Sequence, residues 1–247
     1  MIVNHHARSP TDVACQDCNL SEVCLPRAFK PSDQGILARI VRNRRPLTRG
    51  DHLFLEGDPF CSVFVVRSGA LKVYSTSHEG EVQISGFYLS SEWVGLNGLA
   101  HNHYPVSAQA LETTAVCEIP FDEFDHLCAQ YPSLRRQLMQ AMGLRICEHQ
   151  RMSLLLSKKT AEQRFATLLL DLSARLGSRG FSPKHFRLPM SRNELGNYLG
   201  LALETVSRIL SRLQSVGLII VNGRDVQILS LHGLHQIART TGPVKMQ

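Results

Sequence analysis

Short apolar runs separated by glycines fill the stretch from residue 47 to residue 120. The glycines recur at intervals of roughly ten residues, a spacing typical of strands joined by tight turns. They are Gly50, Gly57, Gly69, Gly80 and Gly86. The clearest apolar runs occupy residues 63–66, 71–74, 82–87 and 115–119 and are too short for helices. The pattern predicts an antiparallel sandwich or barrel in this part of the chain.

A long helix is predicted directly after this region, from residue 133 to about residue 157, where there is no proline and one glycine, Gly143. A set of its residues follows the alternating three- and four-residue spacing of a heptad seam. These residues are Met139, Met142, Ile146, His149, Ser153 and Leu156. Two partners remain open for the seam: the chain's own sandwich, or the same helix in a second subunit. The polar His149 and Ser153 are unusual for an ordinary core.

Two capping boxes mark helix starts in the last third of the chain. Thr160 with Gln163 predicts a helix over residues 161–176 that is stopped by Gly177. A loop is expected over residues 180–189. Ser191 with Glu194 then predicts a second helix, which ends at Gly200.

The stretch from residue 191 to residue 216 has the dimensions of a helix-turn-helix. A tight turn at residues 200–202 leads into a second helix that begins near Leu203. One face of that helix is apolar, with Val206, Ile209, Leu210 and Leu213. The opposite face is polar, with Glu204, Ser207, Arg208 and Ser211.

This polar face suits the major groove of double-stranded DNA. Arg208 can bond both acceptors of guanine, Glu204 can accept from the cytosine amino group, and Ser207 is adaptable. Thr205 and Ser191 are expected to contact phosphates through hydroxyl or backbone N–H groups.

An alternative is that Glu204 and Arg208, four residues apart, form an ordinary surface ion pair. Three features favour DNA binding instead. The first is charge: the whole chain is +6, but residues 158–247 carry 13 basic and 5 acidic residues, which is +8. The second is the short turn between the two helices. The third is Asn222-Gly223 between two apolar runs, a hairpin signal that predicts the wing of a winged helix.

The length of 247 residues suggests two domains, and the composition is that of an ordinary globular protein. The sequence lacks the run of about 18 apolar residues that a membrane helix needs. Its first residues also lack the apolar core of a signal peptide. We therefore expect a cytoplasmic protein with no membrane association.

All seven cysteines precede residue 148, and three of them, Cys15, Cys18 and Cys24, lie within ten residues. An odd number in a reducing compartment argues against a disulfide framework. Three thiols so close together can reach one metal centre, either zinc or an iron-sulfur cluster. The fourth ligand is left open by spacing alone. The candidates are Cys61, Cys117, Cys128 and Cys147, with His5 or His6 as further choices for zinc.

These thiols could have two other roles. Cys15 and Cys18 could serve a thiol-redox enzyme, although no βαβ pattern surrounds them. The three clustered thiols could also bind nothing. The cysteines that are not ligands are expected to be core residues.

Several motifs together resemble the FNR (fumarate and nitrate reductase regulator) proteins, the oxygen-sensing members of the CRP/FNR superfamily. The similarity covers almost the whole chain. The motifs are Cys15-Gln16-Asp17-Cys18 to Cys24-Leu25-Pro26, the segments 109–113 and 117–121, the run 154–159, and Gly196-Asn197-Tyr198-Leu199-Gly200 to Glu204-Thr205-Val206-Ser207-Arg208.

The resemblance implies an α+β protein in four parts. Residues 1–30 form a cysteine-rich cluster-binding segment, and residues 31–130 form a β-roll (jelly-roll) sensor domain of the cyclic-nucleotide-binding type. Residues 131–157 form a dimerisation helix that pairs through Met139, Met142, Ile146, His149 and Leu156. Residues 158–247 form a winged helix-turn-helix. It also implies that Cys117 joins Cys15, Cys18 and Cys24 as the fourth ligand of a [4Fe-4S] cluster.

The same resemblance implies an oxygen-responsive transcription regulator, not an enzyme. A homodimer would bind a palindrome of TTGAT-type half-sites through Glu204, Ser207 and Arg208, contact RNA polymerase, and control anaerobic metabolism. In cyclic-AMP-binding relatives a Glu and an Arg-Ser pair hold the nucleotide. The corresponding segments here, residues 95–99 and 106–108, lack the Glu and the Arg, so no cyclic nucleotide is expected. One departure is His149, where the FNR pattern has an aspartate.

Overall fold

The computed structural model describes residues 15, 18, 20–21, 23–28 and 35–239. They divide into two compact units. Unit 1 comprises Met1–Ser75 and Phe87–Gly143, and unit 2 comprises Thr76–Gly86 and Leu144–Gln247. None of the helices in these described segments is long and apolar enough to span a membrane.

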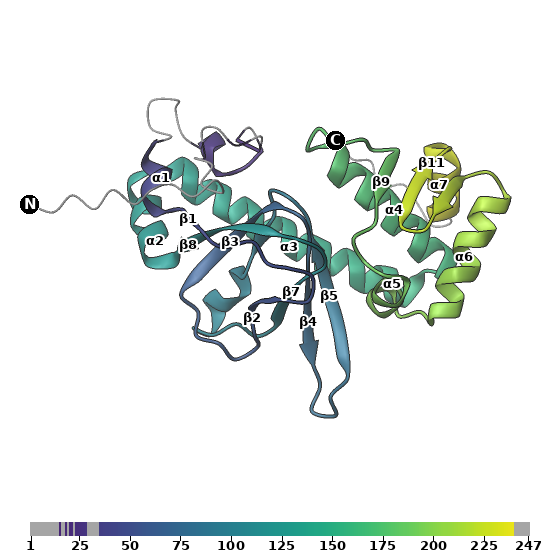
Figure 1. Ribbon diagram of the computed structural model, residues 1–247, viewed down its shortest axis with the longest axis horizontal. Coiled ribbons are helices and arrows are strands. Elements are labelled where there is room, and N and C mark those ends of the chain that lie inside the picture. Colours follow the sequence, from purple (N-terminus) through teal and green to yellow (C-terminus); the bar gives the residue numbers. More distant parts are fainter. Residues whose placement is uncertain (1–14, 16–17, 19, 22, 29–34, 240–247) are drawn as a thin grey trace, which may run out of the picture. The chain divides into compact units, whose positions relative to one another are not determined.

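Two four-stranded antiparallel sheets form most of unit 1 (Figure 1), which confirms the predicted sandwich. One sheet has the order β1-β8-β3-β6, with β1 at Arg42–Asn43, β8 at Ala115–Pro120, β3 at Ser62–Ser68 and β6 at Trp93–Val94. The other has the order β2-β7-β4-β5, with β2 at His52–Phe54, β7 at Ser107–Ala110, β4 at Leu71–Thr76 and β5 at Val82–Tyr88. Two 3-10 helices, η2 (Leu25–Ala28) and η4 (Leu96–Ala100), complete its short elements.

The turn between β3 and β4 shows why glycine recurs in this region. Gly69 has a φ of 82°, in the left-handed region that side chains avoid. A Cβ at this position would also lie 2.5 Å from the carbonyl oxygen of Thr113. Only glycine therefore allows this turn to pack against the neighbouring backbone.

Helices α1 (Leu37–Ile40) and α2 (Phe121–Gln130) belong to unit 1, and α3 (Pro132–Lys158) begins in unit 1 and continues into unit 2 from Leu144. The long helix α3 confirms the prediction for residues 133–157. Helix α2 is not predicted from the sequence and follows β8 without a loop. Tyr131 separates α2 from α3 with an extended backbone (φ −121°, ψ 91°), as expected for a residue before proline. Pro132 then occupies the first position of α3, where a missing N–H does no harm.

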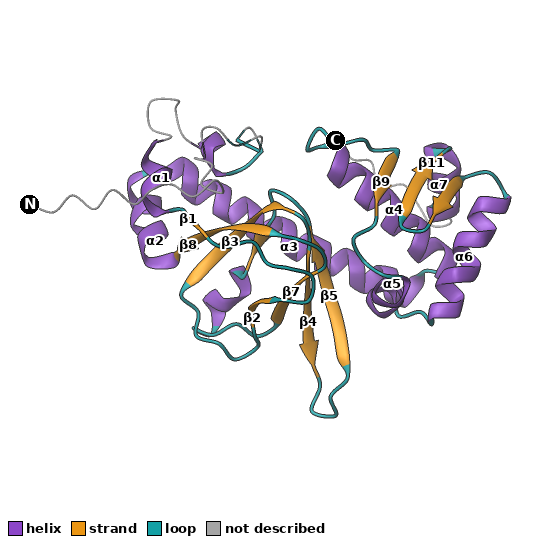
Figure 2. Ribbon diagram, in the orientation of Figure 1, coloured by secondary structure: helices purple, strands orange, loops and turns teal. Residues whose placement is uncertain are grey.

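Unit 2 contains four complete helices and a three-stranded sheet (Figure 2). The helices are α4 (Ala161–Gly177), α5 (Arg192–Leu199), α6 (Leu203–Ser215) and α7 (Leu231–Ala238). The sheet has the order β10-β11-β9, with β10 at Ile219–Asn222, β11 at Asp225–Ile228 and β9 at His185–Arg187. Both predicted capping boxes are present, on α4 and on α5.

Two details of unit 2 differ from the sequence predictions. The expected loop at residues 180–189 contains strand β9, where Phe186 pairs with Val226 of β11 and is buried between exposed neighbours. The wing hairpin is present, but its two-residue turn is Gly223-Arg224, because Asn222 still pairs with Asp225. The Asn-Gly signal therefore located the hairpin and misplaced its turn by one residue.

The tip of the β4–β5 hairpin groups with unit 2. The side chain of Asn197 on α5 makes two hydrogen bonds to the backbone of β5, in the positions that a neighbouring strand would occupy. Its Nδ2 donates to the Val82 carbonyl oxygen at 2.6 Å, and the Ile84 N–H donates to its Oδ1 at 2.7 Å. These bonds satisfy an edge that would otherwise present unpaired backbone groups.

Candidate cluster-binding and DNA-binding sites

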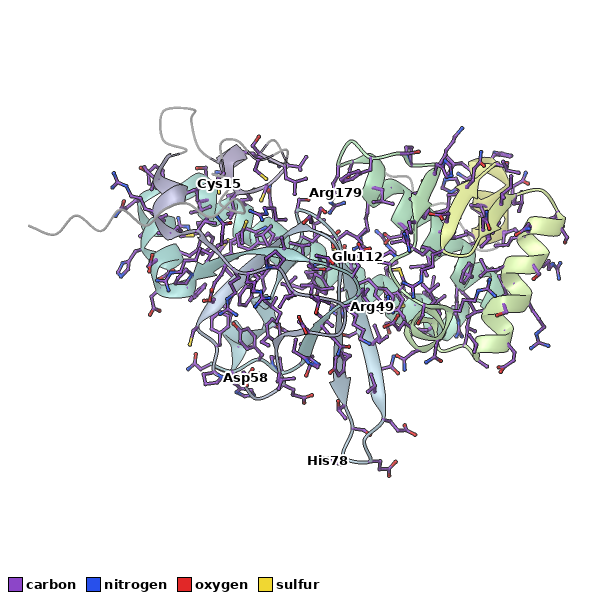
Figure 3. The ribbon with its side chains drawn as sticks, in the orientation of Figure 1. Cys15, Arg49, Asp58, His78, Glu112 and Arg179 are labelled. Atoms are coloured by element: carbon purple, nitrogen blue, oxygen red, sulfur yellow. The ribbon has the colours of Figure 1, made fainter. Side chains whose placement is uncertain are left out.

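The four cysteines assigned by the family resemblance come from two elements of unit 1. Cys15, Cys18 and Cys24 lie in the turns before and at the start of η2, where Ser21 N–H donates to the Cys18 carbonyl at 2.9 Å. Cys117 lies in the middle of β8, opposite Val65 of β3. Figure 3 labels Cys15 among the purple N-terminal turns.

The pKa values of Cys15, Cys24 and Cys117 indicate that the four thiols lie near one another, because neighbouring thiols contribute to each of the three raised values. Burial, with the neighbouring thiols of Cys117, Cys15 and Cys18, raises the pKa of Cys24 to about 12, against a backbone hydrogen bond at Leu25 that lowers it. Burial likewise raises the pKa of Cys117 to about 12, and Cys15 and Cys18 act in the same direction. Burial and then Cys18 raise the pKa of Cys15. The structure thus brings together the thiols that spacing alone could not connect.

An apolar core supports this group of thiols. Cys15, Cys24 and Cys117 pack against a cluster of buried side chains drawn from η2, α1, α2, α3 and the β1-β8-β3-β6 sheet. Members include Leu25, Leu37, Val63, Ile119, Phe124 and Leu134. A thiol group against such a core is shielded from water, which favours metal ligation over solvation of a free thiolate.

The other cysteines do not take part in this group. Cys128 is buried on α2, and burial with the nearby Asp125 raises its pKa to about 11. Cys61 and Cys147 are exposed. The core interpretation therefore holds for Cys128 and is wrong for Cys61 and Cys147. His5 and His6 lie outside the described residues.

No set of three or more His, Cys, Asp or Glu side chains is arranged to hold a single metal ion in the segments that the structure describes. The donor set at the thiol group is nevertheless suited to an iron-sulfur cluster, in which each iron takes one thiolate. The four neighbouring thiols, supported by the apolar core, provide that donor set.

The second candidate site is the helix-turn-helix of unit 2, formed by α5 and α6. Gly200 ends α5 in a left-handed conformation (φ 63°, ψ 45°). Gly196 was not singled out as a site residue, yet a Cβ there would lie 2.5 Å from the Leu201 carbonyl oxygen. The close approach of the turn to α5 therefore requires glycine at this position.

Helix α6 presents the two faces that the sequence predicts. Val206, Ile209, Leu210 and Leu213 are buried. Glu204, Arg208 and Ser211 are exposed, and Ser207 and Thr205 are partly exposed. Arg208 Nη2 donates to Thr205 Oγ1 at 3.3 Å, and no ion pair joins Glu204 to Arg208 in this described helix. Both charged groups are thus available on the outer surface.

The two predicted phosphate contacts have different surroundings. Ser191 caps α5, and its Oγ donates to Glu194 Oε2 at 2.8 Å, so its hydroxyl is already engaged. Thr205 lies in the first turn of α6. That helix has Ala202 as its N-cap, without a side-chain cap, so its first N–H groups point outward at a terminus that favours anions.

The seam on α3 is largely exposed to solvent within the single chain. Met139 is 65%, Met142 39% and Ile146 58% exposed. His149 is also exposed, and Leu156 is partly buried. Met139 and Met142 belong to the same unit as the sandwich, and their exposure shows that this part of the seam does not pack against it.

One structural residue of unit 2 was missed from the sequence. Arg164 on α4 donates three hydrogen bonds to backbone carbonyls near the ends of two helices. Its acceptors are Leu156 and Lys159, at 2.6 and 3.0 Å near the end of α3, and Leu199, at 3.0 Å at the end of α5. An arginine on an amphipathic helix gives no sequence signal for such a role.

The interior of the β-roll is filled by aromatic side chains. The rings of Phe54 and Tyr104 stack with centroids 3.9 Å apart, and Phe64 and Phe60 pack beside them. The Tyr104 hydroxyl donates to the Ser62 carbonyl at 2.6 Å. Gly95 touches this stack closely enough that a Cβ would lie 3.1 Å from the Tyr104 ring.

Two family models match the chain. Residues 44–131 match the cyclic nucleotide-binding domain, and residues 163–237 match the Crp-like helix-turn-helix domain. The first covers the β-roll apart from β1, together with α2. The second covers most of α4, both helices of the helix-turn-helix, the wing and most of α7.

Similar proteins are named as transcription regulators. The chain is 58% identical to the transcriptional activator protein anr of Pseudomonas aeruginosa, over 87% of this chain and 88% of that protein. It is 54% identical to the transcriptional activator protein FnrA of Stutzerimonas stutzeri, over 94% and 95%. It is 43% identical to the fumarate and nitrate reduction regulatory protein of Escherichia coli K12, over 93% and 92%.

Among solved structures, FixK2 from Bradyrhizobium japonicum matches with a TM-score of 0.75 and 28% identity, covering 82% of this chain and all of that one. A CooA mutant from Carboxydothermus hydrogenoformans matches with a TM-score of 0.68 and 21% identity, covering 90% and 96%. The second likeness concerns the fold alone.

Proposed function

Because this chain belongs to the FNR-type branch of the CRP/FNR family and is therefore a DNA-binding transcription regulator, not an enzyme, we propose that it senses oxygen. In this proposal its active form is a cytoplasmic homodimer that carries a [4Fe-4S] cluster and binds palindromic TTGAT-type sites. It controls genes of anaerobic metabolism. The thiol-redox enzyme considered from the sequence is set aside by the same relatives.

The observation that carries the oxygen-sensing proposal is that Cys15, Cys24 and Cys117 pack against one apolar core, with Cys18 close enough to raise the pKa of the other three thiols. These are the residues that would hold the cluster. When bound, the cluster supplies iron that reacts with oxygen and a link between the N-terminal turns and β8. The raised pKa values of Cys24 and Cys117 mean that these two thiols stay protonated without the cluster, so ligation must displace their protons.

The chain itself offers a route from the thiols to the dimer helix. Gln137 on α3 donates from Nε2 to the Cys24 carbonyl oxygen at 3.0 Å. Leu134, one turn earlier on α3, is fully buried in the core that supports the thiols. The position of the cysteine turns is thus coupled to the start of α3. An effector works through such coupling only if it binds the dimer-competent state more tightly.

The exposed seam of α3 supports a second copy of this chain as its partner. Met139, Met142 and Ile146 are large apolar side chains in water, and a symmetric pairing of two helices would bury them. His149 would then lie at the interface, where the family pattern has a carboxylate. A dimer also places two α6 helices on DNA, one for each half-site.

DNA recognition is assigned to α6 of unit 2. Glu204, Ser207 and Arg208 would contact base edges, and the uncapped N-terminus of α6 with Thr205 would contact phosphate. The Ser191 hydroxyl is engaged in the capping box of α5. Ser191 would therefore contribute to phosphate binding more by holding the start of α5 in place than through its hydroxyl.

We place the RNA polymerase contact at the turn of the β4–β5 hairpin, near Gly80 and Glu81. Figure 3 shows His78 at the tip of this hairpin. The turn is closed by a bond from Gly80 N–H to the Ser77 carbonyl at 2.9 Å, and its residues are exposed.

A cyclic nucleotide is not expected as a ligand. The stacked rings of Phe54 and Tyr104 occupy the interior of the roll. A nucleotide would have to separate this stack, and neither segment 95–99 nor segment 106–108 offers a charged side chain for its phosphate.

The cluster proposal is tested by anaerobic purification of wild type, Cys117→Ser and Cys61→Ser. Wild type and Cys61→Ser should be coloured, contain about four irons per chain, and bleach in air. Cys117→Ser should contain little iron and remain colourless. The measurements are iron and acid-labile sulfide analysis with the visible spectrum. A colourless zinc-loaded wild type that binds DNA equally with and without air would instead support the alternative, a DNA-binding regulator of the same fold with a structural zinc site and a small-molecule ligand.

The DNA proposal is tested with Arg208→Ala on sites in which one G·C pair of each half-site is changed to A·T. Wild type should lose roughly tenfold or more in affinity for the changed site, because a bidentate arginine–guanine contact contributes about 1–3 kcal/mol. Arg208→Ala should bind both sites almost equally. Arg212→Ala is the matched control on the same helix, because Arg212 is paired with Glu162 at 3.2 Å. If Arg212→Ala removes discrimination and Arg208→Ala keeps it, the assignment is wrong.

A further inference from the structure

Unit 1 contains a cavity of about 300 Å³ beside the cysteine turns. One wall is Arg27 of η2. The other is a single face of the first turns of α3, with residues spaced three, four and seven apart. These residues are Ser133, Arg136, Gln137 and Gln140. The cavity therefore lies between the turns that carry three of the four thiols and the helix that is proposed to form the dimer.

The described residues that line the cavity are all polar or positively charged. Arg27 and Arg136 contribute two guanidinium groups, and no acidic side chain lines the cavity among the residues that the structure describes. Neither guanidinium has an ion pair within the part of the chain that the structure describes. Two unneutralised guanidinium groups that face one small cavity favour an anion, and planar guanidinium groups suit carboxylate and phosphate oxygens in particular.

Gln137 places a different requirement on the ligand, because it offers a hydrogen-bond acceptor where the two arginines offer donors. Its Nε2 is used by the Cys24 carbonyl oxygen at 3.0 Å, which fixes the orientation of the amide. Its Oε1 is buried and has no hydrogen-bond partner. A buried acceptor without a partner is unfavourable by about 1–3 kcal/mol, so a group that donates a hydrogen bond should be favoured at this atom.

We propose that this cavity binds a small oxyanion that also carries a hydroxyl group. The anionic oxygens would accept hydrogen bonds from Arg27 and Arg136, and the hydroxyl would donate to Gln137 Oε1. Hydrogen phosphate and 2-hydroxycarboxylates share this chemistry. Because Gln137 also holds the Cys24 carbonyl, bound anion would stabilise the arrangement of the cysteine turns against α3. The chain would thus respond to a metabolite in addition to oxygen.

The test is isothermal titration calorimetry of the full-length, anaerobically purified protein at pH 7 and constant ionic strength. Two matched pairs of probes are compared: phosphate with sulfate, and malate with succinate. Phosphate and malate each carry a hydroxyl donor, and sulfate and succinate do not. At least one donor-bearing anion should bind about tenfold or more tightly than its partner. A difference between phosphate and sulfate would identify a phosphate ligand. A difference between malate and succinate would identify a 2-hydroxycarboxylate.

Three single substitutions locate the binding. Arg27→Gln and Arg136→Gln should each weaken the preferred anion about tenfold or more. Both side chains are exposed at the cavity mouth, so folding should be preserved. Arg135→Gln is the matched control, because Arg135 is an exposed neighbour on α3 that does not line the cavity. Equal binding of both members of each pair, or an equal loss for all three variants, would overturn the proposal. Neither result depends on oxygen or on DNA, so it leaves the proposed function intact.

Discussion

At the scale of single residues, Gly196 is the most tightly constrained position of the helix-turn-helix. Gly196→Ala would place a Cβ 2.5 Å from the Leu201 carbonyl oxygen, and backbone atoms cannot yield as a flexible side chain can. We expect the turn to shift, with a loss of about 1–3 kcal/mol in the free energy of unfolding. DNA affinity should fall as well, because the turn sets the direction of α6. Urea unfolding and a DNA-binding titration measure the two effects.

Gly143→Ala is the matched control for that substitution. Gly143 also lies inside a helix, but a Cβ there would meet nothing within 4 Å. Alanine should therefore raise the free energy of unfolding by about 0.5–1 kcal/mol through helix propensity alone. Equal effects of the two substitutions would show that Gly196 has no special packing role.

The thiol group shows how far residue-level prediction from sequence can go. Spacing brings Cys15, Cys18 and Cys24 together because the chain between them is short. It gives no information on Cys117, which is far along the chain and reaches the group only because β8 pairs with β3 beside the same core. Family resemblance supplied the fourth residue, and the electrostatic coupling of Cys24 with Cys117 now supports it.

At the scale of elements, Arg164 ties the end of α3 to the helix-turn-helix within unit 2. Arg164→Ala would leave the carbonyls of Leu156, Lys159 and Leu199 without this donor. A loss of about 2–4 kcal/mol in the free energy of unfolding is expected, because partly buried helix ends need hydrogen-bond partners. Lysine offers a single point donor instead of a planar fork, so Arg164→Lys should recover only part of this stability.

Thermal and urea unfolding of the full-length protein measure this effect, with Arg151→Ala as the control. The Arg151 side chain is 61% exposed, and its Nη1 lies 3.9 Å from Asp171 Oδ1. Such a surface ion pair should contribute less than about 1 kcal/mol to the free energy of unfolding. A comparable loss for Arg151→Ala and Arg164→Ala would contradict the role given to Arg164.

The elements predicted correctly are those with strong local signals. The capping boxes located α4 and α5, and glycine spacing located the sandwich. Strand β9 was missed because three residues are too few to show a period, and its pairing partner β11 lies far along the chain. Helix α2 was missed for a different reason, because it follows β8 directly and no turn residue separates them.

At the scale of the whole molecule, the question that sequence left open was the partner of the α3 seam. A heptad pattern reports only that one face is apolar; it does not report what covers that face. Exposure of Met139 and Met142 within unit 1 excludes the chain's own sandwich as the partner of that part of the seam. The same limit applies to charge: composition places +8 in residues 158–247, and the fold shows which of those residues lie on the outer face of α6.

Ile146→Glu tests whether dimerisation through this seam controls DNA binding. By two-fold symmetry one substitution places two carboxylates in the interface, which should weaken the dimer on the order of a hundredfold or more. Sedimentation measures this change. A monomer contacts about half as many phosphates, so the slope of log affinity against log salt should fall to about half the wild-type value. Leu144→Glu is the control, because Leu144 is 65% exposed and lies about 200° around the helix from Ile146. If Leu144→Glu dissociates the dimer and Ile146→Glu does not, the subunits pair through another face of α3.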